Sequence, residues 1–255
     1  MSRPIAITER AQRNHEELFP NRKSTLKVTD PELIEIFDNF AFDEVLAESK
    51  LETRTRVVLI LAAAIGGNAV AEFGILLGAA LDAGVTPVEA KEIVYQSVAY
   101  VGMARAFDFI QATNDVLTAR GVPLPLEGQS TTERHTRYDA GLATQKAVFG
   151  RAIDQLYERS PKDQLHVQRF LSANCFGDYY TRTGIELKLR ELITLSILIA
   201  LGGVESQIKG HIQGNLNVGN GRDVLLDAIT QLLPWVGYPR TLNALSALNE
   251  VVPER

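Results

Sequence analysis

The chain has 255 residues, of which 45% are hydrophobic and 22% charged, and its formal net charge is −5. This composition is typical of a globular protein with a substantial core, arranged as one large domain or two of ordinary size. The acidic balance, with no basic cluster, argues against nucleic acid and anionic membranes as partners.

The N-terminal sequence and the rare residue types narrow the class of protein and its expected location further. Residues 1–14 lack the apolar core of a signal peptide, and no apolar run reaches the roughly 20 residues of a membrane span, so we expect a cytoplasmic location. The single cysteine, Cys175, excludes an internal disulfide and a CxxC redox pair, and its apolar context indicates a packing residue. Without HxH or HExxH spacing, the histidines predict no metal site. They are His15, His135, His166 and His211, and we expect His135 and His166 at the surface.

Helix signals recur along the first half, and no stretch keeps the period-2 alternation of a strand. A weak helix is expected at 11–19. Thr86 precedes Pro87, and Glu89 follows at the third helical position, which is the pattern of a capped helix start. The sequence therefore predicts an all-α fold.

The second half continues this pattern. An amphipathic helix is expected at 146–157, and the stretch 160–163 (SPKD) predicts a further helix start. Asn220 is a candidate cap for a later helix, which Pro234 is expected to break. A last helix is expected at 239–251.

The segment 187–219 predicts a site. Its run 192–201 is nearly all aliphatic and indicates a buried helix with Glu191 at its head. After a Gly-Gly turn, helical spacing of small and apolar residues predicts a second helix with His211 near its middle. Two antiparallel helices would bring Glu191 and His211 within reach, and a buried carboxylate needs such a partner. The spacing alone leaves open whether the pair is a structural hydrogen bond or a catalytic pair.

The chain also contains an internal duplication. The stretch 52–67 (ETRTRVVLILAAAIGG) aligns with 188–203 (KLRELITLSILIALGG), and 93–116 aligns with 228–251. The offset of the first alignment exceeds that of the second by a single residue, which implies a one-residue insertion or deletion between them.

The boundary between the two halves is expected in a linker. Residues 121–132 (GVPLPLEGQSTT) are dense in Pro, Gly and Ser/Thr. With the boundary placed near Leu126, the chain divides into a first repeat, 1–125, and a second repeat, 126–255.

The second repeat resembles a known family. Its stretch FGDYYTRTGIELKLRELITLSILIALGGVESQIKGHIQGNLNVGN is similar to the core of the carboxymuconolactone decarboxylase family, whose pattern includes FGd, REl and Hi.gAlnnG. The residues in register are Phe176, Gly177, Asp178, Arg182, Gly184, Leu187, Arg190, Glu191, Thr194, Leu195, His211, Gly214 and Gly219. Asn215 departs from the pattern, which has alanine there. The first half resembles the family more distantly, so the resemblance covers nearly the whole chain as two fused family domains.

The resemblance implies a helical fold of the kind found in alkylhydroperoxidase D. Single-domain members assemble as rings of six, so we expect a homo-oligomer, a trimer of two-domain chains with a six-domain ring. The family reaction removes CO2 from a small unsaturated lactone carboxylic acid. It implies no cofactor, because the lactone itself accepts the electrons.

The resemblance and the side-chain chemistry together suggest roles for individual residues. His211 is the candidate general acid, and Glu191 is expected to orient its ring and keep it protonated. Arg190 is a candidate for binding a substrate carboxylate, although a helix neighbour of Glu191 points about 100° away from it, which favours a structural role. The candidate walls of the substrate pocket are Trp235, Tyr179 and Tyr180, for which a position in the core is the alternative.

Two other functions stay open. An antioxidant protein of the peroxidase branch carries CxxC seven and four residues before the histidine, and here these positions hold Val204 and Gln207. The other alternative is a non-catalytic small-ligand binder or scaffold.

The first repeat is expected to lack the site. Thr55 aligns with Glu191, and Leu76 aligns with His211. Neither residue moves a proton near neutral pH. We therefore expect a degenerate first repeat in which Leu76 is buried as packing, and which helps to shape the neighbouring pocket.

Overall fold

The computed structural model describes residues 6–20 and 24–254, and this part of the chain contains helices and no strand. The first repeat forms α1 (Glu9–Leu18), α2 (Leu26–Thr29), α3 (Pro31–Asn39), the π-helix η1 (Phe40–Glu44), α4 (Val45–Ala47), α5 (Thr53–Gly66), α6 (Val70–Asp82), α7 (Pro87–Val101) and α8 (Met103–Ala119). The second repeat forms α9 (Arg137–Phe149), α10 (Ala152–Arg159), the 3₁₀-helix η2 (Lys162–Gln164), α11 (Leu165–Phe170), the π-helix η3 (Leu171–Tyr180), α12 (Leu187–Leu201), α13 (Glu205–Asn217), α14 (Arg222–Val236) and α15 (Tyr238–Val251). The prediction of an all-α fold is confirmed.

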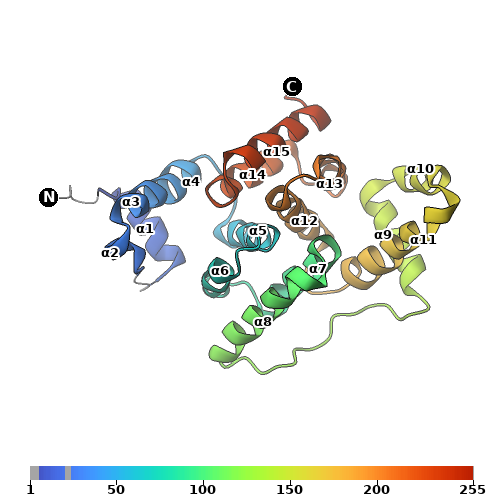
Figure 1. The fold of residues 1–255 in the computed structure, drawn as a ribbon, viewed down its shortest axis with the longest axis horizontal. Coiled ribbons are helices and arrows are strands. Elements are labelled where there is room, and N and C mark those ends of the chain that lie inside the picture. The colour runs from blue at the N-terminus through green and yellow to red at the C-terminus, as the bar shows by residue number, and fades with distance from the viewer. Residues whose placement is uncertain (1–5, 21–23, 255) are drawn as a thin grey trace.

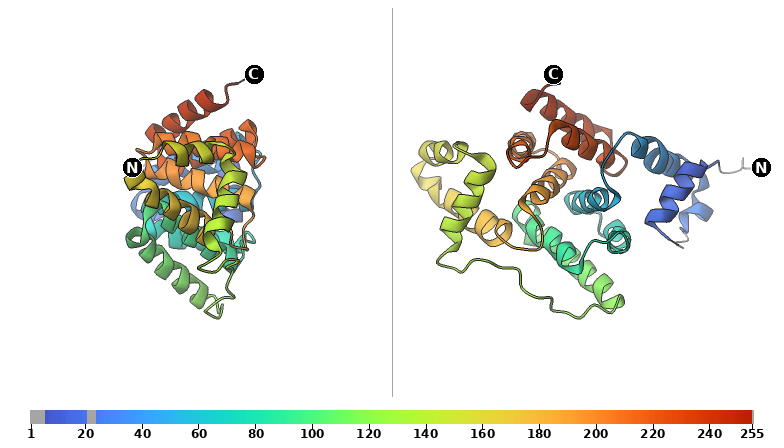
Figure 2. Two further views of the ribbon diagram at one scale, coloured as in Figure 1. Left: turned by 90° about the vertical axis from the view of Figure 1, so that its right-hand side faces the viewer. Right: turned by 180° about the vertical axis from the view of Figure 1, so that it is seen from behind.

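The molecule is elongated, with a helical group at each end of a central bundle (Figure 1). The helices α1 to α4 lie at one end and α9 to α11 at the other, and the view from behind shows the same order (Figure 2). In the middle of the bundle, α5 of the first repeat packs against α12 of the second. The two repeats therefore share one core.

The helices of the two repeats correspond in order and in spacing. The paired starts are Val70 and Glu205 for α6 and α13, Pro87 and Arg222 for α7 and α14, and Met103 and Tyr238 for α8 and α15. The offset in residue number is the same for all three pairs. A π-helix precedes the core helix in each repeat, η1 before α5 and η3 before α12. The tandem duplication of a helical domain is confirmed.

The core helices align differently from the sequence comparison. Their C-caps, Gly67 and Gly202, have the same offset as the three later pairs, but their first residues, Thr53 and Leu187, lie one residue closer in number because α5 has 14 residues and α12 has 15. Counted from the C-caps, Arg56 occupies the position of Glu191, and counted from the helix starts Val57 does, so neither end of the helix places Thr55 there. Aligning the two Gly-Gly pairs misled because the first glycine of the first pair still lies inside α5, whereas both glycines of the second pair follow α12 with positive φ.

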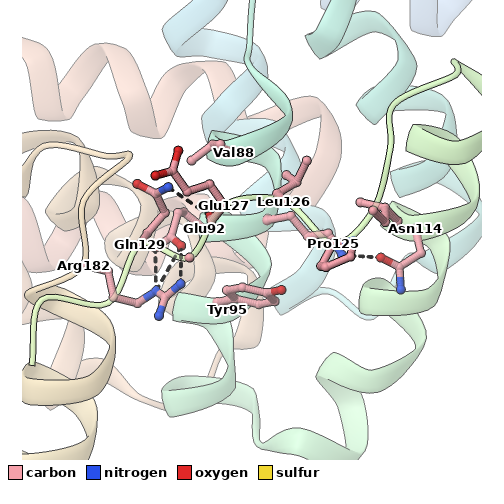
Figure 3. A pocket seen from close by; sticks show the side chains of 12 residues that line it. Val88, Glu92, Tyr95, Asn114, Pro125, Leu126, Glu127, Gln129 and Arg182 are labelled. Carbon is pink, nitrogen blue, oxygen red and sulfur yellow. Dashed lines mark hydrogen bonds and ion pairs between the residues drawn. The ribbon is translucent and has the colours of Figure 1, made fainter. Parts of the chain in front are cut away.

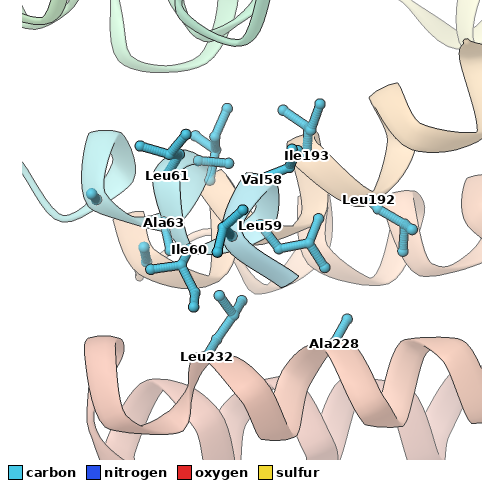
Figure 4. Packing of buried hydrophobic residues seen from close by; sticks show 14 of the residues in the cluster. Val58, Leu59, Ile60, Leu61, Ala63, Leu192, Ile193, Ala228 and Leu232 are labelled. Atoms are coloured by element: carbon cyan, nitrogen blue, oxygen red, sulfur yellow. The ribbon is translucent and has the colours of Figure 1, made fainter. Parts of the chain in front are cut away.

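The two core helices are buried on nearly all sides, which explains their continuous apolar sequence. Figure 4 shows side chains such as Leu59 of α5 and Ile193 of α12 packed together with α14 beneath them. The backbones approach closely at Gly66, where a Cβ atom would lie 2.4 Å from the carbonyl oxygen of Ile197. Because each fully buried Leu or Ile contributes roughly 1.5–3 kcal/mol, this pair forms a rigid frame for the site.

Several predicted helix ends agree with the structure. Thr86 caps α7 as predicted: its hydroxyl accepts a hydrogen bond from the Glu89 amide, and the Glu89 carboxylate accepts one from the Thr86 amide. The weak helix expected at 11–19 is α1, and the last helix, expected at 239–251, is α15.

Other predicted helix features are wrong. The helix expected at 146–157 is divided, because Gly150 adopts φ +61° and ends α9 before α10 begins. The helix start predicted at 160–163 is present, as the 3₁₀-helix η2 that runs directly into α11, but Ser160 does not cap it, since its hydroxyl donates to the carbonyl oxygen of Leu156. Asn220 does not cap α14, since its side-chain amide instead donates to a backbone carbonyl of α12. Pro234 does not break α14. It lies two residues before the end of the helix, where a proline disrupts little of the helical backbone.

The linker between the repeats lies against α7 and α8 of the first repeat and then contacts the second repeat. Residues 120–136 connect α8 to α9 without a helix (Figure 1). The carbonyl oxygen of Gln129 accepts a 3.0 Å hydrogen bond from the amide of Thr183. The hydroxyl of Thr132 donates to the carbonyl oxygen of Gly177 at 2.9 Å. Across residues 6–20 and 24–254, no helix has the length and apolar character that crossing a membrane requires.

Candidate active site

Glu191 of α12 and His211 of α13 meet in the core of the second repeat. Nδ1 of His211 lies 2.9 Å from Oε2 of Glu191. Glu191 is fully buried and His211 is 8% exposed. The structure therefore brings together the two residues that the sequence places at the centre of the site.

Glycines make this approach possible. Gly202 and Gly203 both have positive φ, which lets the chain turn between α12 and α13. Gly214 lies one helical turn after His211, and a Cβ atom there would lie 2.6 Å from Oε2 of Glu191. Only a residue without a side chain leaves the Glu191 carboxylate in its place.

Asn215, which departs from the family pattern, ties the two helices together. Its side-chain amide donates to the carbonyl oxygens of Glu191 at 3.0 Å and of His211 at 2.8 Å. Its own oxygen accepts a hydrogen bond from Asn220. Oε1 of Glu191, in contrast, is buried and has no hydrogen-bond partner among the described residues. An unpaired buried carboxylate oxygen is costly, which makes this a place where a ligand donor would be favoured.

Two aromatic rings enclose the imidazole of His211. Phe149 at the end of α9 packs edge to face against it with ring centroids 5.2 Å apart. Tyr100 at the end of α7 does the same at 5.8 Å. Because α7 belongs to the first repeat, the site contains residues of both repeats.

A chain of buried hydroxyl groups leads away from Tyr100. Its hydroxyl lies 2.8 Å from that of Tyr180, which lies 2.5 Å from the hydroxyl of Thr194. Gln96 donates to the same Thr194 hydroxyl at 2.8 Å. Burial raises the pKa of Tyr100 and of Tyr180 well above their usual value, so both stay protonated and can donate hydrogen bonds.

Cys175 lies beside this chain, with Sγ 3.8 Å from the Tyr100 hydroxyl. The residue is buried, as the sequence predicts. Burial raises the pKa of its thiol to about 12. Because the thiolate is the reactive form, Cys175 is inert near neutral pH and serves as packing.

Arg190 faces away from the pair and is fully buried. Its guanidinium binds Glu92 and Gln96 of α7 at 2.9 and 3.0 Å. The remaining donors bind the carbonyl oxygens of Ile185, Arg182 and Thr183. Through Glu92 and Gln96, Arg190 ties the second repeat to the first. Because its donors are in use, a substrate carboxylate would have to displace these partners.

The structure places the other sequence candidates outside this centre. Tyr179 is half-buried in η3, where it interacts with Asn174, Asp178, Cys175 and Arg182. Trp235 of α14 packs on Phe37 of α3 and lines a cavity of the first repeat. His135 and His166 are exposed, as predicted.

A second hollow lies near the linker (Figure 3). This cavity of about 470 Å³ is lined by α7, α8 and linker residues such as Pro125 and Leu126. On its wall, Nε of Arg182 donates to both carboxylate oxygens of Glu92 at 3.0 and 3.1 Å, and the guanidinium lies over the ring of Tyr95. Glu92 is thereby held between Arg182 and Arg190, so this polar group is already satisfied by the protein.

Sequence reasoning missed Tyr100, Phe149 and Gln96. All three lie far from His211 in the sequence, and no local motif marks them. The duplication held a usable signal, because Tyr100 and the predicted Trp235 each lie fourteenth from the start of their helices, α7 and α14, and so occupy equivalent places. The prediction of Trp235 selected the correct position in the wrong repeat. The helix that packs beside His211 is α7, which belongs to the first repeat, and not α14 of the second.

Comparisons with known proteins agree with this fold. The sequence profile of the Carboxymuconolactone decarboxylase family matches residues 31–115 and 166–250. The 4-carboxymuconolactone decarboxylase of Acinetobacter baylyi (strain ATCC 33305 / BD413 / ADP1) is 28% identical over 116 residues, which cover 45% of this chain and 86% of that protein. A crystal structure from Burkholderia xenovorans LB400, described as that of a gamma-carboxymuconolactone decarboxylase subunit, covers 97% of this chain and 99% of its own at a TM-score of 0.57. At 19% identity, this last likeness shows the fold alone.

The fold and the site define a class of protein: two fused helical repeats around a shared core, with a buried Glu–His pair in the second. Both repeats match the same family profile. The chain belongs to the carboxymuconolactone decarboxylase family.

Proposed function

We propose that the chain is a cofactor-free decarboxylase-like enzyme that acts on a small unsaturated lactone carboxylic acid, with its active site at His211. One observation carries the proposal: His211 and Glu191 form a 2.9 Å pair that is buried between apolar rings. The name of the Acinetobacter relative indicates the substrate class. An imidazole oriented by a carboxylate is a suitable general acid for replacing CO2 by a proton.

The chemistry follows from the two nitrogens of the imidazole. Because Nδ1 faces Glu191, Nε2 is the nitrogen left to exchange a proton with a substrate. As the bond from carbon to the carboxylate breaks, CO2 leaves and the electron pair passes into the unsaturated lactone, giving a dienolate. Protonated His211 then delivers its Nε2 proton to carbon, which restores a neutral lactone. Glu191 stabilises the imidazolium before this transfer.

The buried hydroxyls suit the charge that develops in this reaction. The dienolate carries negative charge on its lactone oxygen, and a fixed donor nearby stabilises it. Tyr100 is protonated, lies against His211 and is fixed by Tyr180. We assign Tyr100 as the donor to the lactone oxygen.

The chemistry of the cysteine disfavours the antioxidant alternative. A thiol peroxidase needs a thiolate and a thiol that resolves it. The single thiol, Cys175, has its pKa raised to about 12 by burial. A non-catalytic ligand binder is the remaining alternative for the second repeat, and turnover by the pure protein separates the two.

Assembly into a trimer with a six-domain ring is also part of the proposal. Both end groups of the chain expose large apolar side chains, Leu33 and Ile36 on α3 and Val167 and Phe170 on α11. Contact between the ends of neighbouring chains would cover these surfaces and close a ring. Light scattering is expected to give three times the chain mass, and a monomer at micromolar concentration would contradict it.

The decisive experiment follows lactone loss by ultraviolet absorbance across a panel of carboxylated unsaturated lactones. We expect the pure protein, without added metal or cofactor, to consume at least one of them and to release CO2. The His211→Ala variant is expected to lose this turnover. Inactivity of the wild type across the panel, or full activity of the variant, would reject the proposal.

A further inference from the structure

The first repeat contains a cavity of about 550 Å³ between α1, α2, α3, η1, α6 and α14. Pockets for small molecules commonly measure roughly 300–1,000 Å³ and are mostly apolar with a few polar groups. The apolar wall here includes Phe19, Phe37, Phe42, Ile75 and Trp235. The cavity therefore has the size and the lining of a ligand site.

This cavity lies beside the position that corresponds to the His211 site. Trp235 of its wall stands in α14 where Tyr100 stands in α7. Ile75 of its wall precedes Leu76, the residue that replaces His211. Leu76 is buried, as the sequence predicts. The first repeat lacks the acid of the second site, but it has a cavity beside that position.

Asp38 gives this cavity a polar group of its own. The residue lines the cavity and is 3% exposed, and its Oδ2 has no hydrogen-bond partner among the described residues. Nζ of Lys27 lies 3.9 Å from Oδ2, which is too far for a hydrogen bond. A buried carboxylate oxygen without a donor is unfavourable, and a ligand that supplies one would recover the lost solvation.

Aromatic rings lie next to this carboxylate. Phe37, the neighbour of Asp38 in sequence, packs edge to face on Trp235 at 5.4 Å and on Phe42 at 6.1 Å. Aromatic faces attract cations, most strongly when solvent is excluded. Among the described residues, the lining also carries the exposed carboxylate of Glu72 and the basic side chains of His15 and Lys27. The preference for a cation therefore rests on the buried oxygen of Asp38, which lacks a donor, and on the aromatic rings around it.

We propose that this cavity binds a small organic amine, whose ammonium group pairs with the Asp38 carboxylate and whose apolar body packs against Phe37, Phe42 and Trp235. The site is independent of decarboxylation at His211. It gives the first repeat a binding function in place of the catalytic pair that it lacks.

The sequence supplies a direct reporter, because Trp235 is the only tryptophan. Its fluorescence therefore reports on this cavity without a label. We would titrate the full-length protein with 2-phenylethylammonium and, in parallel, with 3-phenylpropionate, which has a similar body and the opposite charge. The expected result is a saturable change with the amine and none with the carboxylate at equal concentration. No saturable change with the amine, or equal binding of the carboxylate, would overturn the proposal.

Three variants locate the binding. Asp38→Asn keeps the shape of the side chain and removes its charge, so it is expected to weaken amine binding about tenfold or more. Glu32→Gln, at an exposed acid of the same helix that does not line the cavity, is the matched control and should leave binding unchanged. His211→Ala should bind the amine like the wild type, which separates this proposal from the function of the other site. Unchanged binding by Asp38→Asn would reject the proposal, and if that variant does not fold, the comparison of the two probes on the wild type still decides.

Discussion

Tyr100 of the first repeat packs edge to face against His211 of the second, with ring centroids 5.8 Å apart and ring planes at 76°. The helix that carries Tyr100 also reaches the second repeat through Gln96, which donates to the Thr194 hydroxyl and to the Arg190 carbonyl oxygen. The proposed active site is therefore complete only when both repeats are folded together. The first repeat shapes the site without supplying an acid or a base.

Removing the Tyr100 hydroxyl tests its assigned role as a donor. Tyr100→Phe keeps the ring against His211 and breaks the 2.8 Å link to Tyr180. We expect kcat to fall on the order of 10²-fold, as for the loss of one fixed donor to a developing oxyanion. Tyr95→Phe, on the same helix but beside Arg182, is the control and should leave kcat near the wild-type value. Equal rates for the two variants would show that the hydroxyl takes no part.

A single methyl group at Gly214 is expected to disable the pair. In Gly214→Ala the new Cβ atom would lie 2.6 Å from Oε2 of Glu191 and 2.8 Å from Val148, so the carboxylate must move. Turnover should fall sharply, while the protein stays folded. Gly210→Ala, on the same helix with no atom within 4 Å, should keep its activity and gain roughly 0.5–1 kcal/mol from better helix propensity. Activity and urea unfolding of the two variants measure both effects, and an active Gly214→Ala would contradict this geometry.

Substitutions at His211 and Leu76 are expected to have opposite effects. His211→Ala removes the proposed acid and should lower turnover about 10²-fold or more while leaving the fold nearly as stable. Leu76→Ala leaves a cavity in the core and should cost roughly 2–5 kcal/mol of unfolding free energy. Turnover per folded molecule should stay close to wild type in Leu76→Ala. If His211→Ala retained full turnover on the true substrate, the chemistry would have to take place elsewhere.

Much of the fold could be predicted from the sequence, because its signals are local or repeated. The aliphatic run of α12 and the capping box at Thr86 can each be recognised from a few consecutive residues. Self-similarity identified the duplication without any structure. The errors arose where a single glycine or proline determines whether a helix continues. Gly150 splits a predicted helix, and α14 accommodates Pro234 near its end.

The candidate site was only partly predictable, for a different reason. Glu191 and His211 lie on consecutive helices, so their spacing sufficed. Tyr100 reaches the site through an exchange of helices between the repeats, which no periodicity reveals. The cavity at Asp38 was missed because its polar and aromatic residues come from α1 to η1 and α6 in the first repeat and from α14 near the other end of the sequence.

Arg190 is expected to act on stability and not on substrate affinity. Arg190→Met leaves Glu92 buried beside Arg182 alone and should cost roughly 3–5 kcal/mol, the usual penalty for breaking a buried pair from one side. Adding Glu92→Gln removes the uncompensated charge and should restore part of this loss. Urea unfolding of the single and double variants measures the coupling. A single variant with wild-type stability and a raised KM would instead support substrate binding by Arg190.

The stability of the first repeat should carry a pH dependence that originates at Asp38. Burial raises the pKa of Asp38 above its ordinary value of 3.8, and His15 of α1 and Lys27 of α2 lower it in part. A raised pKa means that the folded state holds the proton more tightly than the unfolded state. The resulting stabilisation is fully present below the unfolded pKa and is lost as the pH rises through the folded pKa. Above that value the ionised, buried carboxylate lowers the stability of the wild type.

Asp38→Asn removes this titration, so we expect its melting temperature to exceed that of the wild type at pH 7 to 8. The difference should shrink as the pH falls toward the ordinary pKa of Asp38, because the wild-type carboxyl then becomes neutral too. Circular dichroism melts of both proteins across this range test the sign, and using the difference cancels the acid sensitivity of other groups. Added 2-phenylethylammonium should raise the melting temperature of the wild type at pH 7 by more than that of the variant. A difference that is constant with pH would mean that Asp38 keeps its ordinary pKa in the folded protein.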